Sequence, residues 1–245
     1  RSSAASDVYK RQTFLQRAYD QLIHDVVLQK LDVTLAIDRA GFVGGDGATH
    51  AGIFDVSFLR CIPDMVIMSP SDENECWKML TTAYEYSGPA AVRYPRGEGP
   101  GAEIDTNFDS IDIGKARTLR EENSDIVIFS FGNMLNLSEE IANELQCSLV
   151  DMRFIKPLDE TLIEKCAKKY KHLISIEENV ISGGAGSAVS EFLSKLGCSE
   201  KLEIIGIPDE FPIVGSQEDQ REAAGLTKEK IMSQLNTDLN LKNIN

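Results

Sequence analysis

Two arginines each follow directly on an apolar run of the kind that forms a buried strand. Arg39 follows residues 33–38, and Arg96 follows residues 90–95. If both strands are parallel in one sheet, the two guanidinium groups lie on the same rim, because open parallel sheets bind ligands at the carboxyl ends of their strands. Arginine forks match phosphate oxygens in bidentate fashion. The pair therefore predicts a phosphate clamp, although a single arginine at a strand end is more often an ordinary surface or salt-bridged residue.

The loop that leaves the first of these strands, residues 39–52, adds an acid, a base and several glycines. Asp46 and His50 are its candidates for direct contact with a substrate. A lone loop histidine is more often structural, but this one shares its rim with two arginines. Glycines allow tight turns and a close approach of the backbone to a ligand, and they are Gly41, Gly44, Gly45, Gly47 and Gly52. Long loops inside compact domains are usually functional, and the alternative is a merely flexible surface loop.

The composition of the 245 residues excludes several classes of partner. A net charge of −14 argues against a nucleic acid, which needs a positive surface, and against an anionic membrane. No apolar run approaches the ~20 residues of a membrane span, and residues 1–12 lack the apolar core of a signal peptide. The five cysteines are scattered and form no zinc-binding pair. We therefore predict a cytoplasmic protein with reduced thiols, no metal ligands among these residues, and neither nucleic acid nor membrane as a partner.

The elements that must position these side chains alternate between strands and helices, which is typical of parallel sheets. Beyond the two strands above, apolar runs predict strands at 65–69, 125–131, 148–154, 172–178 and 202–207. Helical periodicity predicts helices at 13–31 and between the later strands, with the last at 228–235. Asp72 is expected to cap the helix that runs to Tyr86, with Glu75 as its partner in a capping box.

This alternation predicts the α/β fold class, with two α/β domains and mostly parallel sheets. Residues 98–111 carry glycines, a proline and acids without an apolar pattern, and we interpret them as the linker between domains at 13–97 and 112–235. The asparagine-rich residues 236–245 are expected to fray. Residues 1–12 are polar and aperiodic, so we interpret them as disordered or foreign to the rest of the chain.

Six longer segments of the sequence carry a resemblance to a known family. They are TFLQRAYDQ (13–21), AIDRAGFVGGDGATHAGIFD (36–55), RCIPDMVIMSPSDENE (60–75), AVRYPRG (91–97), VDMRFIKPLD (150–159) and EENVISGGAGSAVSE (177–191). These segments resemble the 1-deoxy-D-xylulose-5-phosphate synthases, a thiamine-diphosphate-dependent family of transketolase-like enzymes. The resemblance runs from Thr13 to about Leu235.

The resemblance implies an enzyme of three α/β domains, of which this chain holds a truncated pyrimidine-binding domain and a C-terminal domain. In the family, the first domain binds the diphosphate and Mg²⁺, and a catalytic glutamate lies upstream of Thr13. We therefore expect the chain to be a fragment that is inactive alone. The family has a tyrosine two residues before that threonine, where this chain has Arg11. This difference supports a foreign origin for residues 1–12.

The activity implied by the resemblance joins pyruvate to glyceraldehyde 3-phosphate with loss of CO₂, in the biosynthesis of isoprenoid precursors, thiamine and pyridoxal. The full-length enzyme would be a cytoplasmic homodimer that uses thiamine diphosphate and Mg²⁺. Phe14 would stack on the aminopyrimidine of the cofactor, and Arg17 would lie near the same ring. The implied substrate residues coincide with the rim deduced from the strand ends, and they are the phosphate-binding Arg39 and Arg96 and the catalytic His50 and Asp46.

Two short motifs are set aside. Residues 45–47 (Gly-Asp-Gly) and Asn74 have about the spacing of the metal motif of thiamine-diphosphate enzymes. That motif needs Gly-Asp-Gly directly after a strand, whereas here it lies mid-loop, and Asn74 falls in the first turn of a helix. Residues 183–186 resemble a dinucleotide fingerprint, but Val189 takes the place of its third glycine. We interpret them as the close-packed N-terminus of a helix that faces an anion or a subunit partner.

Two alternative functions stay open. Another transketolase-like protein, such as the β subunit of a 2-oxoacid dehydrogenase, pairs the same two domains. Its substrates carry no phosphate, so it would not need Arg39 and Arg96 together. The chain could also be a separate interaction or regulatory module without catalysis.

Overall fold

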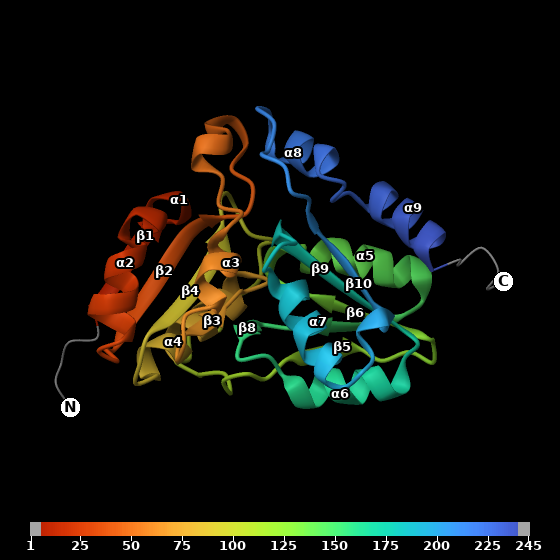
Figure 1. Cartoon of the computed structure of the whole chain (residues 1–245), viewed down its shortest axis with the longest axis horizontal. Coiled ribbons are helices and arrows are strands. Elements are labelled where there is room, and N and C mark those ends of the chain that lie inside the picture. The colour runs from red at the N-terminus through yellow and green to blue at the C-terminus, as the bar shows by residue number, and fades with distance from the viewer. Residues whose placement is uncertain (1–5, 240–245) are drawn as a thin grey trace.

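The computed structural model describes residues 6–239, which form two α/β domains around two five-stranded sheets (Figure 1). The order of the first sheet is β1-β2-β4-β3-β8, with β1 at Ser6–Arg11, β2 at Val33–Ala40, β3 at Val66–Met68, β4 at Ala90–Pro95 and β8 at Phe154–Lys156. The order of the second is β10-β9-β6-β7-β5, with β5 at Arg117–Arg120, β6 at Ile126–Ser130, β7 at Ser148–Asp151, β9 at His172–Val180 and β10 at Leu202–Ile207.

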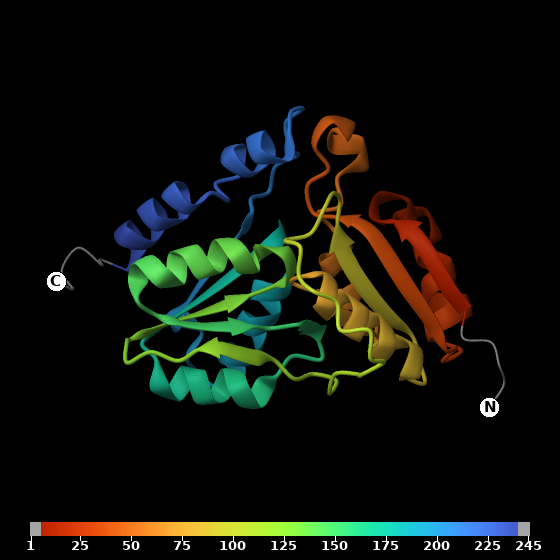
Figure 2. The same cartoon turned by 180° about the vertical axis from the view of Figure 1, so that it is seen from behind.

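Most neighbouring strands run parallel, which confirms the predicted α/β fold class. The exceptions are one strand in each sheet, because β8 pairs with β3 and β5 pairs with β7 in antiparallel fashion. Helices cover both sheets, and they are α3 (Asp55–Arg60), α4 (Glu73–Glu85), α5 (Leu135–Leu145), α6 (Glu160–Lys169), α7 (Ala185–Lys195), α8 (Gln217–Ala223) and α9 (Lys228–Asp238). In the second domain, α7 lies in front of the sheet in Figure 1, and α5 lies in front of it in the reverse view of Figure 2.

The first helical segment is less regular than its periodicity predicts. In place of one helix over 13–31, the chain forms α1 (Gln12–Leu15), a 3₁₀ turn, α2 (Tyr19–Gln21) and a π-helix at Leu22–Val27. Leu22 and Val27 are both buried and lie five residues apart. The wider i→i+5 turn brings both side chains onto the core, which a 3.6-residue repeat would not do.

The N-terminal segment corrects the expectation of disorder in part. Residues 1–5 lie outside the described part of the chain. Ser6–Arg11 form β1, which pairs in parallel with β2 from Ser6 opposite Val33 to Arg11 opposite Asp38. The disorder expected for these six residues is therefore wrong. Apolar periodicity is a poor guide for an edge strand, because the open edge of its neighbour offers a full row of backbone hydrogen-bonding groups to any extended segment.

The cap of α4 confirms half of the expected capping box. The Asp72 side chain accepts a hydrogen bond from the Glu75 backbone N–H at 2.7 Å. The Glu75 carboxylate does not return the bond, because it forms ion pairs with Arg153 at 2.7 Å and with Arg117 at 3.4 Å. Glu75 is almost fully buried, so a charged partner stabilises it more than a neutral backbone donor would.

The strand predicted at 148–154 divides between the two sheets. β7 belongs to the second sheet, whereas β8 crosses to the first sheet and pairs there with β3. Arg153 lies between them with a φ of +57°, a left-handed conformation that turns the chain from one sheet to the other. The second half of the chain therefore supplies the last strand of the first sheet.

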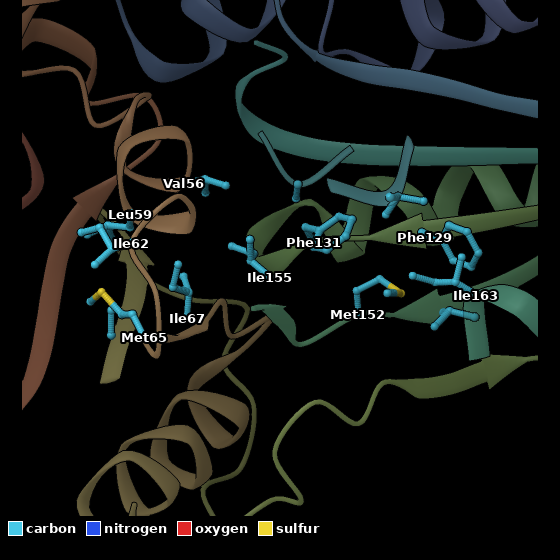
Figure 3. Close-up of a cluster of buried hydrophobic side chains, with 14 of the residues drawn as sticks. Val56, Leu59, Ile62, Met65, Ile67, Phe129, Phe131, Met152, Ile155 and Ile163 are labelled. Atoms are coloured by element: carbon cyan, nitrogen blue, oxygen red, sulfur yellow. The ribbon is translucent and has the colours of Figure 1, made fainter. Parts of the chain in front are cut away.

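One hydrophobic cluster joins the two domains. Figure 3 shows Val56 and Ile67 of the first domain on the side that faces Ile155 of β8, and the cluster continues through Phe131 and other residues of the second domain. Such a shared core resists relative motion of the two domains.

The C-terminal helices extend further than expected. α9 runs to Asp238, so fraying from residue 236 is wrong for the first residues of the tail. Residues 240–245 lie outside the described part of the chain. α8 lies beside the loop that follows β2 in both views, although more than 160 residues separate them (Figures 1 and 2).

Candidate functional site

Neighbouring parallel strands bring Arg39 and Arg96 to one rim. β2 pairs with β4 through Ala40 opposite Pro95, so both chains leave the sheet at the same edge. The register shifts between Asp38 and Ala40, and Arg39 at that point has a φ of +65°. A left-handed conformation costs a non-glycine residue about 1–2 kcal/mol. The fold holds Arg39 in this strained position, which turns its side chain out of the strand's alternation.

Both guanidinium groups converge on one carboxylate. Asp46 Oδ2 accepts a short hydrogen bond from Arg39 Nη1 and lies 3.2 Å from Arg96 Nη1. Arg96 Nη1 also donates to the Val43 carbonyl at 2.5 Å. Asp38 Oδ2 lies 3.8 Å from Arg39 Nε, so Asp38 and Asp46 together balance the two guanidinium charges. This arginine cluster, formed by Arg39, Asp46 and Arg96, still brings two guanidinium groups together in a chain of net charge −14.

The loop that carries Asp46 is closed at its base. Gly41 and Gly52 form an antiparallel bridge, with N–H to O=C distances of 2.6 and 2.9 Å. A Cβ on Gly52 would overlap the carbonyl of Arg39, and one on Gly41, whose φ is +81°, would overlap the Glu178 carboxylate. These two glycines are therefore required by close approach, and the loop is a folded unit rather than a flexible surface segment.

Two short turns aim the acid and the base of this loop in different directions. Gly44–Asp46 and Ala48–His50 are separate 3₁₀ turns, divided by Gly47 with a φ of +70°. Asp46 turns toward the arginines, whereas His50 Nδ1 lies 3.0 Å from the hydroxyl of Thr49. Among the described residues, Asp46 makes no hydrogen bond or ion pair with His50. The expectation that the two would act side by side is thus not matched by a direct contact.

His50 lies with the two residues expected at the cofactor. The ring of Phe14 meets the ring of His50 edge to face, with centroids 5.6 Å apart. The guanidinium carbon of Arg17 lies 5.4 Å from the Phe14 ring centre, within cation–π range. Thr13 Oγ1 donates to the Thr49 carbonyl at 3.2 Å, which ties the first helix to the loop. The structure therefore divides the six predicted residues into the arginine cluster and an aromatic group of Phe14, Arg17 and His50.

Two glutamines that the sequence analysis missed hold the loop from the second domain. Gln217 Nε2 donates to the carbonyls of Phe42 at 2.6 Å and Arg96 at 3.4 Å. The Gln220 amide accepts from the Gly44 N–H at 2.9 Å and donates to the Gly44 carbonyl at 3.2 Å. The sequence does contain a local signal for α8, because its start is a capping box formed by Ser216 and Asp219.

A buried ion pair beneath the loop was also missed. Arg93 and Asp55 are buried and make a bidentate pair, with distances of 2.7 and 3.2 Å. Arg93 Nη2 also donates to the Glu178 carbonyl at 3.4 Å. The signal was a charged residue inside the apolar run 90–95, because arginine is almost never buried without a partner. The pair links α3 and β4 of the first domain to β9 of the second.

The glycine-rich run at 183–186 faces an anion of the chain itself. Glu177 Oε2 and Oε1 accept hydrogen bonds from the backbone N–H groups of Ala185 at 2.7 Å and Gly186 at 2.8 Å, at the start of α7. Full burial raises the pKa of Glu177 to about 7, although these two donors oppose the shift. The helix N-terminus is thus satisfied internally, and residues 183–186 act as a close-packed helix start, as predicted.

A cavity of about 760 Å³ opens beside the arginine cluster. Its lining includes Arg96 and Tyr94 from the end of β4, Asn133 from the 3₁₀ turn that follows β6, and Gln217 and Arg221 from α8. Arg96 is 41% exposed, so its guanidinium can meet a ligand that enters from this side.

The described residues hold no group of three or more His, Cys, Asp or Glu side chains that could bind a metal ion. Asp46 is engaged by the arginines, and Asn74 Oδ1 accepts from the Asp105 N–H at 2.9 Å. The two residues of the rejected metal motif therefore have separate partners. Across residues 6–239, the helices are too short or too polar to cross a membrane.

Two family models match the chain, one on each domain. The model described as "Transketolase, pyrimidine binding domain" matches residues 11–101, and the model described as "Transketolase, C-terminal domain" matches residues 114–231. The first range contains all six predicted site residues, and the second contains α8 with its two glutamines.

Curated relatives named 1-deoxy-D-xylulose-5-phosphate synthase are similar to most of the chain. The protein of Hahella chejuensis is 53% identical over 232 residues, which are 95% of this chain and 36% of the relative. The protein of Cellvibrio japonicus is 54% identical over 214 residues, or 87% of this chain and 34% of the relative. The chain thus spans about a third of the length of the curated relatives it matches.

Solved structures support the same assignment. A split-gene transketolase, described as an inactive β4 tetramer, superposes with a TM-score of 0.84 at 27% identity and covers 98% of this chain and 78% of that one. The transketolase of Campylobacter jejuni shares the fold, with a TM-score of 0.74 at 19% identity over 95% of this chain and 35% of its own. The sequence segments, the two mostly parallel sheets and both family models agree that the chain belongs to the transketolase family, of which it carries a pyrimidine-binding domain and a C-terminal domain.

Proposed function

We propose that this chain forms the part of a 1-deoxy-D-xylulose-5-phosphate synthase that binds the acceptor phosphate and faces the aminopyrimidine of the cofactor. The whole enzyme would join pyruvate to glyceraldehyde 3-phosphate with loss of CO₂. The proposal is supported by the names of relatives that are 50–54% identical to the chain. It assigns the phosphate to Arg39 and Arg96, and places His50 and Asp46 next to the reacting aldehyde.

The observation that carries the proposal is the convergence of two guanidinium groups from neighbouring strand ends on one acidic oxygen. A carboxylate and a phosphate present similar oxygen acceptors to an arginine, so the contact with Asp46 shows that the two guanidinium groups can share one anion. Arg96 opens at the same time into the cavity between the domains. Arg96 is the member of the arginine cluster that lines this cavity, so a phosphorylated aldehyde that enters it would meet Arg96, and its phosphate would compete with Asp46 for that guanidinium group.

The aromatic group fits the aminopyrimidine of thiamine diphosphate in its chemistry. Phe14 is only partly buried, and it meets the His50 ring edge to face with the Arg17 guanidinium over its face. A flat aromatic ring of this kind stacks on another ring, and the nearby cation and imidazole can orient polar groups. When bound, the cofactor supplies the carbanion chemistry of the reaction. The chain's own residues would hold the ring and orient the acceptor, which lowers the entropy cost of bringing two reactants together.

We further propose that the diphosphate and Mg²⁺ sites of the whole enzyme belong to the two thirds of the relatives that this chain does not match. The same proposal includes the oligomeric state and the location that the resemblance implies for the full-length enzyme, a homodimer in the cytoplasm. They rest on the resemblance to the family, and a sedimentation measurement of the full-length protein would test the dimer directly.

The test compares two ligands that differ only in the phosphate. Calorimetric titration of the 245-residue chain should detect binding of glyceraldehyde 3-phosphate and not of glyceraldehyde. Arg96→Ala should weaken the phosphorylated ligand ten- to a hundredfold, because one charge-assisted contact contributes about 1.5–3 kcal/mol. Pyruvate should be affected far less.

The matched control is Arg120→Ala, which removes the same charge from a different surface, where Arg120 pairs with Glu122 and Asn143. This control separates a local contact from a change in net charge. Two results would show that the arginine cluster does not recognise the phosphate. One is equal affinity for the two aldehydes, and the other is an equal loss of affinity for the phosphorylated aldehyde in Arg96→Ala and Arg120→Ala.

A further inference from the structure

We infer that Gln220, assisted by Gln217, is a positioning residue for the acceptor phosphate, so that the C-terminal domain sets the geometry of a site built by the other domain. This inference rests on the proposed function of the arginine cluster. Gln217 lines the cavity, but among the described residues neither glutamine amide hydrogen-bonds to a side chain of the arginine cluster. Both act through the backbone of residues 42–44 and, for Gln217, through that of Arg96.

Gln220 forms hydrogen bonds with both backbone polar groups of one residue, Gly44. Its Oε1 accepts from the Gly44 N–H at 2.9 Å, and its Nε2 donates to the Gly44 carbonyl at 3.2 Å and to the Ile213 carbonyl at 2.8 Å. The side chain is 1% exposed, so water cannot replace these bonds. Gly44 has a φ of +67° and begins the turn that ends at Asp46. A two-way amide clamp on Gly44 therefore determines where the Asp46 carboxylate points.

Gln217 joins the loop to the end of β4. Its Nε2 lies 2.6 Å from the Phe42 carbonyl and 3.4 Å from the Arg96 carbonyl. Arg96 returns to the same loop through its guanidinium, which donates to the Val43 carbonyl at 2.5 Å. The spacing between Arg96 and the loop is thus set by the contacts of the Arg96 side chain with Val43 and Asp46 and by the Gln217 side chain of α8.

An ion pair between α8 and β9 holds the helix that carries both glutamines in place. Arg221 pairs with Glu178 at 2.6 Å, and Asn133 donates to the other oxygen of Glu178 at 2.7 Å. The Glu178 carboxylate lies directly against Gly41, at the foot of the loop. Two side chains of α8 therefore hydrogen-bond to the loop, and a third, Arg221, pairs with the acid that lies against the foot of the loop.

The first experiment measures the clamp itself in the 245-residue chain. Gln220→Met keeps the volume of the side chain and removes all three hydrogen bonds. Hydrogen exchange of the peptide that covers residues 41–52 should become about tenfold faster, because the buried Gly44 N–H loses its acceptor. Exchange in β6 at Ile126–Ser130 should not change. Gln217→Met, at a less buried position, is the second variant if Gln220→Met does not fold.

The second experiment measures the consequence for the ligand, with inorganic phosphate as the probe. Gln220→Met and Gln217→Met should each raise the Kd for phosphate about tenfold, measured at a temperature at which each variant is still fully folded. The matched control is Glu222→Gln, which alters the same helix where Glu222 meets Lys230 and not the loop. This control should bind phosphate as the wild type does.

The outcomes separate this inference from the function on which it rests. A wild-type chain that binds no phosphate at millimolar concentration overturns the proposed function, and the positioning role fails with it. A wild-type chain that binds phosphate, with both glutamine variants binding equally well, overturns the positioning role alone. A loss of affinity that Glu222→Gln shares would also overturn it, because the effect would then come from α8 as a whole.

Discussion

At the scale of single residues, the site depends on where one acid points. Asp46 could face either the histidine or the arginines, and the turn at Gly47 directs it to the arginines. Its carboxylate stabilises two neighbouring cations that would otherwise repel each other, and under the proposed function it occupies the position that a phosphate oxygen would take. A phosphate ligand must compete with it or bind beside it.

We predict that Asp46→Asn strengthens the binding of inorganic phosphate by roughly twofold to fivefold. The substitution keeps the size of the side chain and removes a like charge from the phosphate site, where exposed ion pairs are worth up to about 1 kcal/mol. Any dependence of binding on magnesium should stay as in the wild type. Calorimetric titration with phosphate, with and without magnesium, checks both statements.

Asp109→Asn is the control for the change in net charge, because Asp109 is exposed and lies outside the arginine cluster. Weaker phosphate binding by Asp46→Asn would show that the carboxylate serves mainly to hold the arginines in place. A large shift in the magnesium dependence would instead indicate that residues 45–47 bind the metal ion, against their position in the middle of the loop.

At the scale of elements, α7 begins against a buried acid of β9. Glu177 is fully buried at this junction, and burial raises its pKa from 4.5 to about 7. The folded protein therefore binds more protons than the unfolded chain between those two pH values. The free energy of unfolding should fall as the pH rises through this window. Above it, the titration of Glu177 should add no further pH dependence.

We predict that Glu177→Gln removes this part of the pH dependence. A shift from 4.5 to about 7 corresponds to about 3 kcal/mol. We subtract the free energy of unfolding of the variant from that of the wild type. This difference should be larger at pH 4 than at pH 8, by about 3 kcal/mol. Urea denaturation at both pH values measures it, and curves that stay parallel would contradict the assigned titration.

At the scale of the whole molecule, the two domains share structure that two independent domains would not share. β8 leaves the second domain to complete the first sheet, and the hydrophobic cluster of Figure 3 continues across the junction. Buried ion pairs add to this link, because Glu75 of α4 pairs with Arg153 from the second half of the chain. Breaking a buried pair by removing one partner is strongly destabilising.

We predict that both domains unfold in one transition. Trp77 lies on α4 of the first domain, and the buried Cys147 lies in the second domain. Fluorescence of Trp77 and the reaction of Cys147 with a thiol reagent, followed by mass spectrometry of its peptide, should give the same urea midpoint. Ile155→Ala, on the connecting strand β8, should lower both midpoints together. Two separate midpoints in the wild type would show that the shared cluster does not couple the domains.

The sequence alone determined the α/β class, the positions of most strands, and the meeting of Arg39 and Arg96 at one rim. These features follow from local patterns, because strand periodicity depends on adjacent residues and the rim follows from the rule for parallel strand ends. The resemblance to a family added Phe14 and Arg17, which periodicity alone would place in an ordinary helix.

Only the tertiary structure decided the orientation of Asp46, the division of residues 148–156 between two sheets, and the clamp from α8. It also decided that Ser6–Arg11 lie along an open sheet edge. Each of these depends on a contact between distant parts of the chain, such as the bond between Gln220 and Gly44 across 176 positions. A local sequence pattern indicates which secondary structure a segment can form. The orientation of that segment and of its side chains depends on its tertiary contacts, because a buried polar group adopts the orientation in which its hydrogen bonds are satisfied.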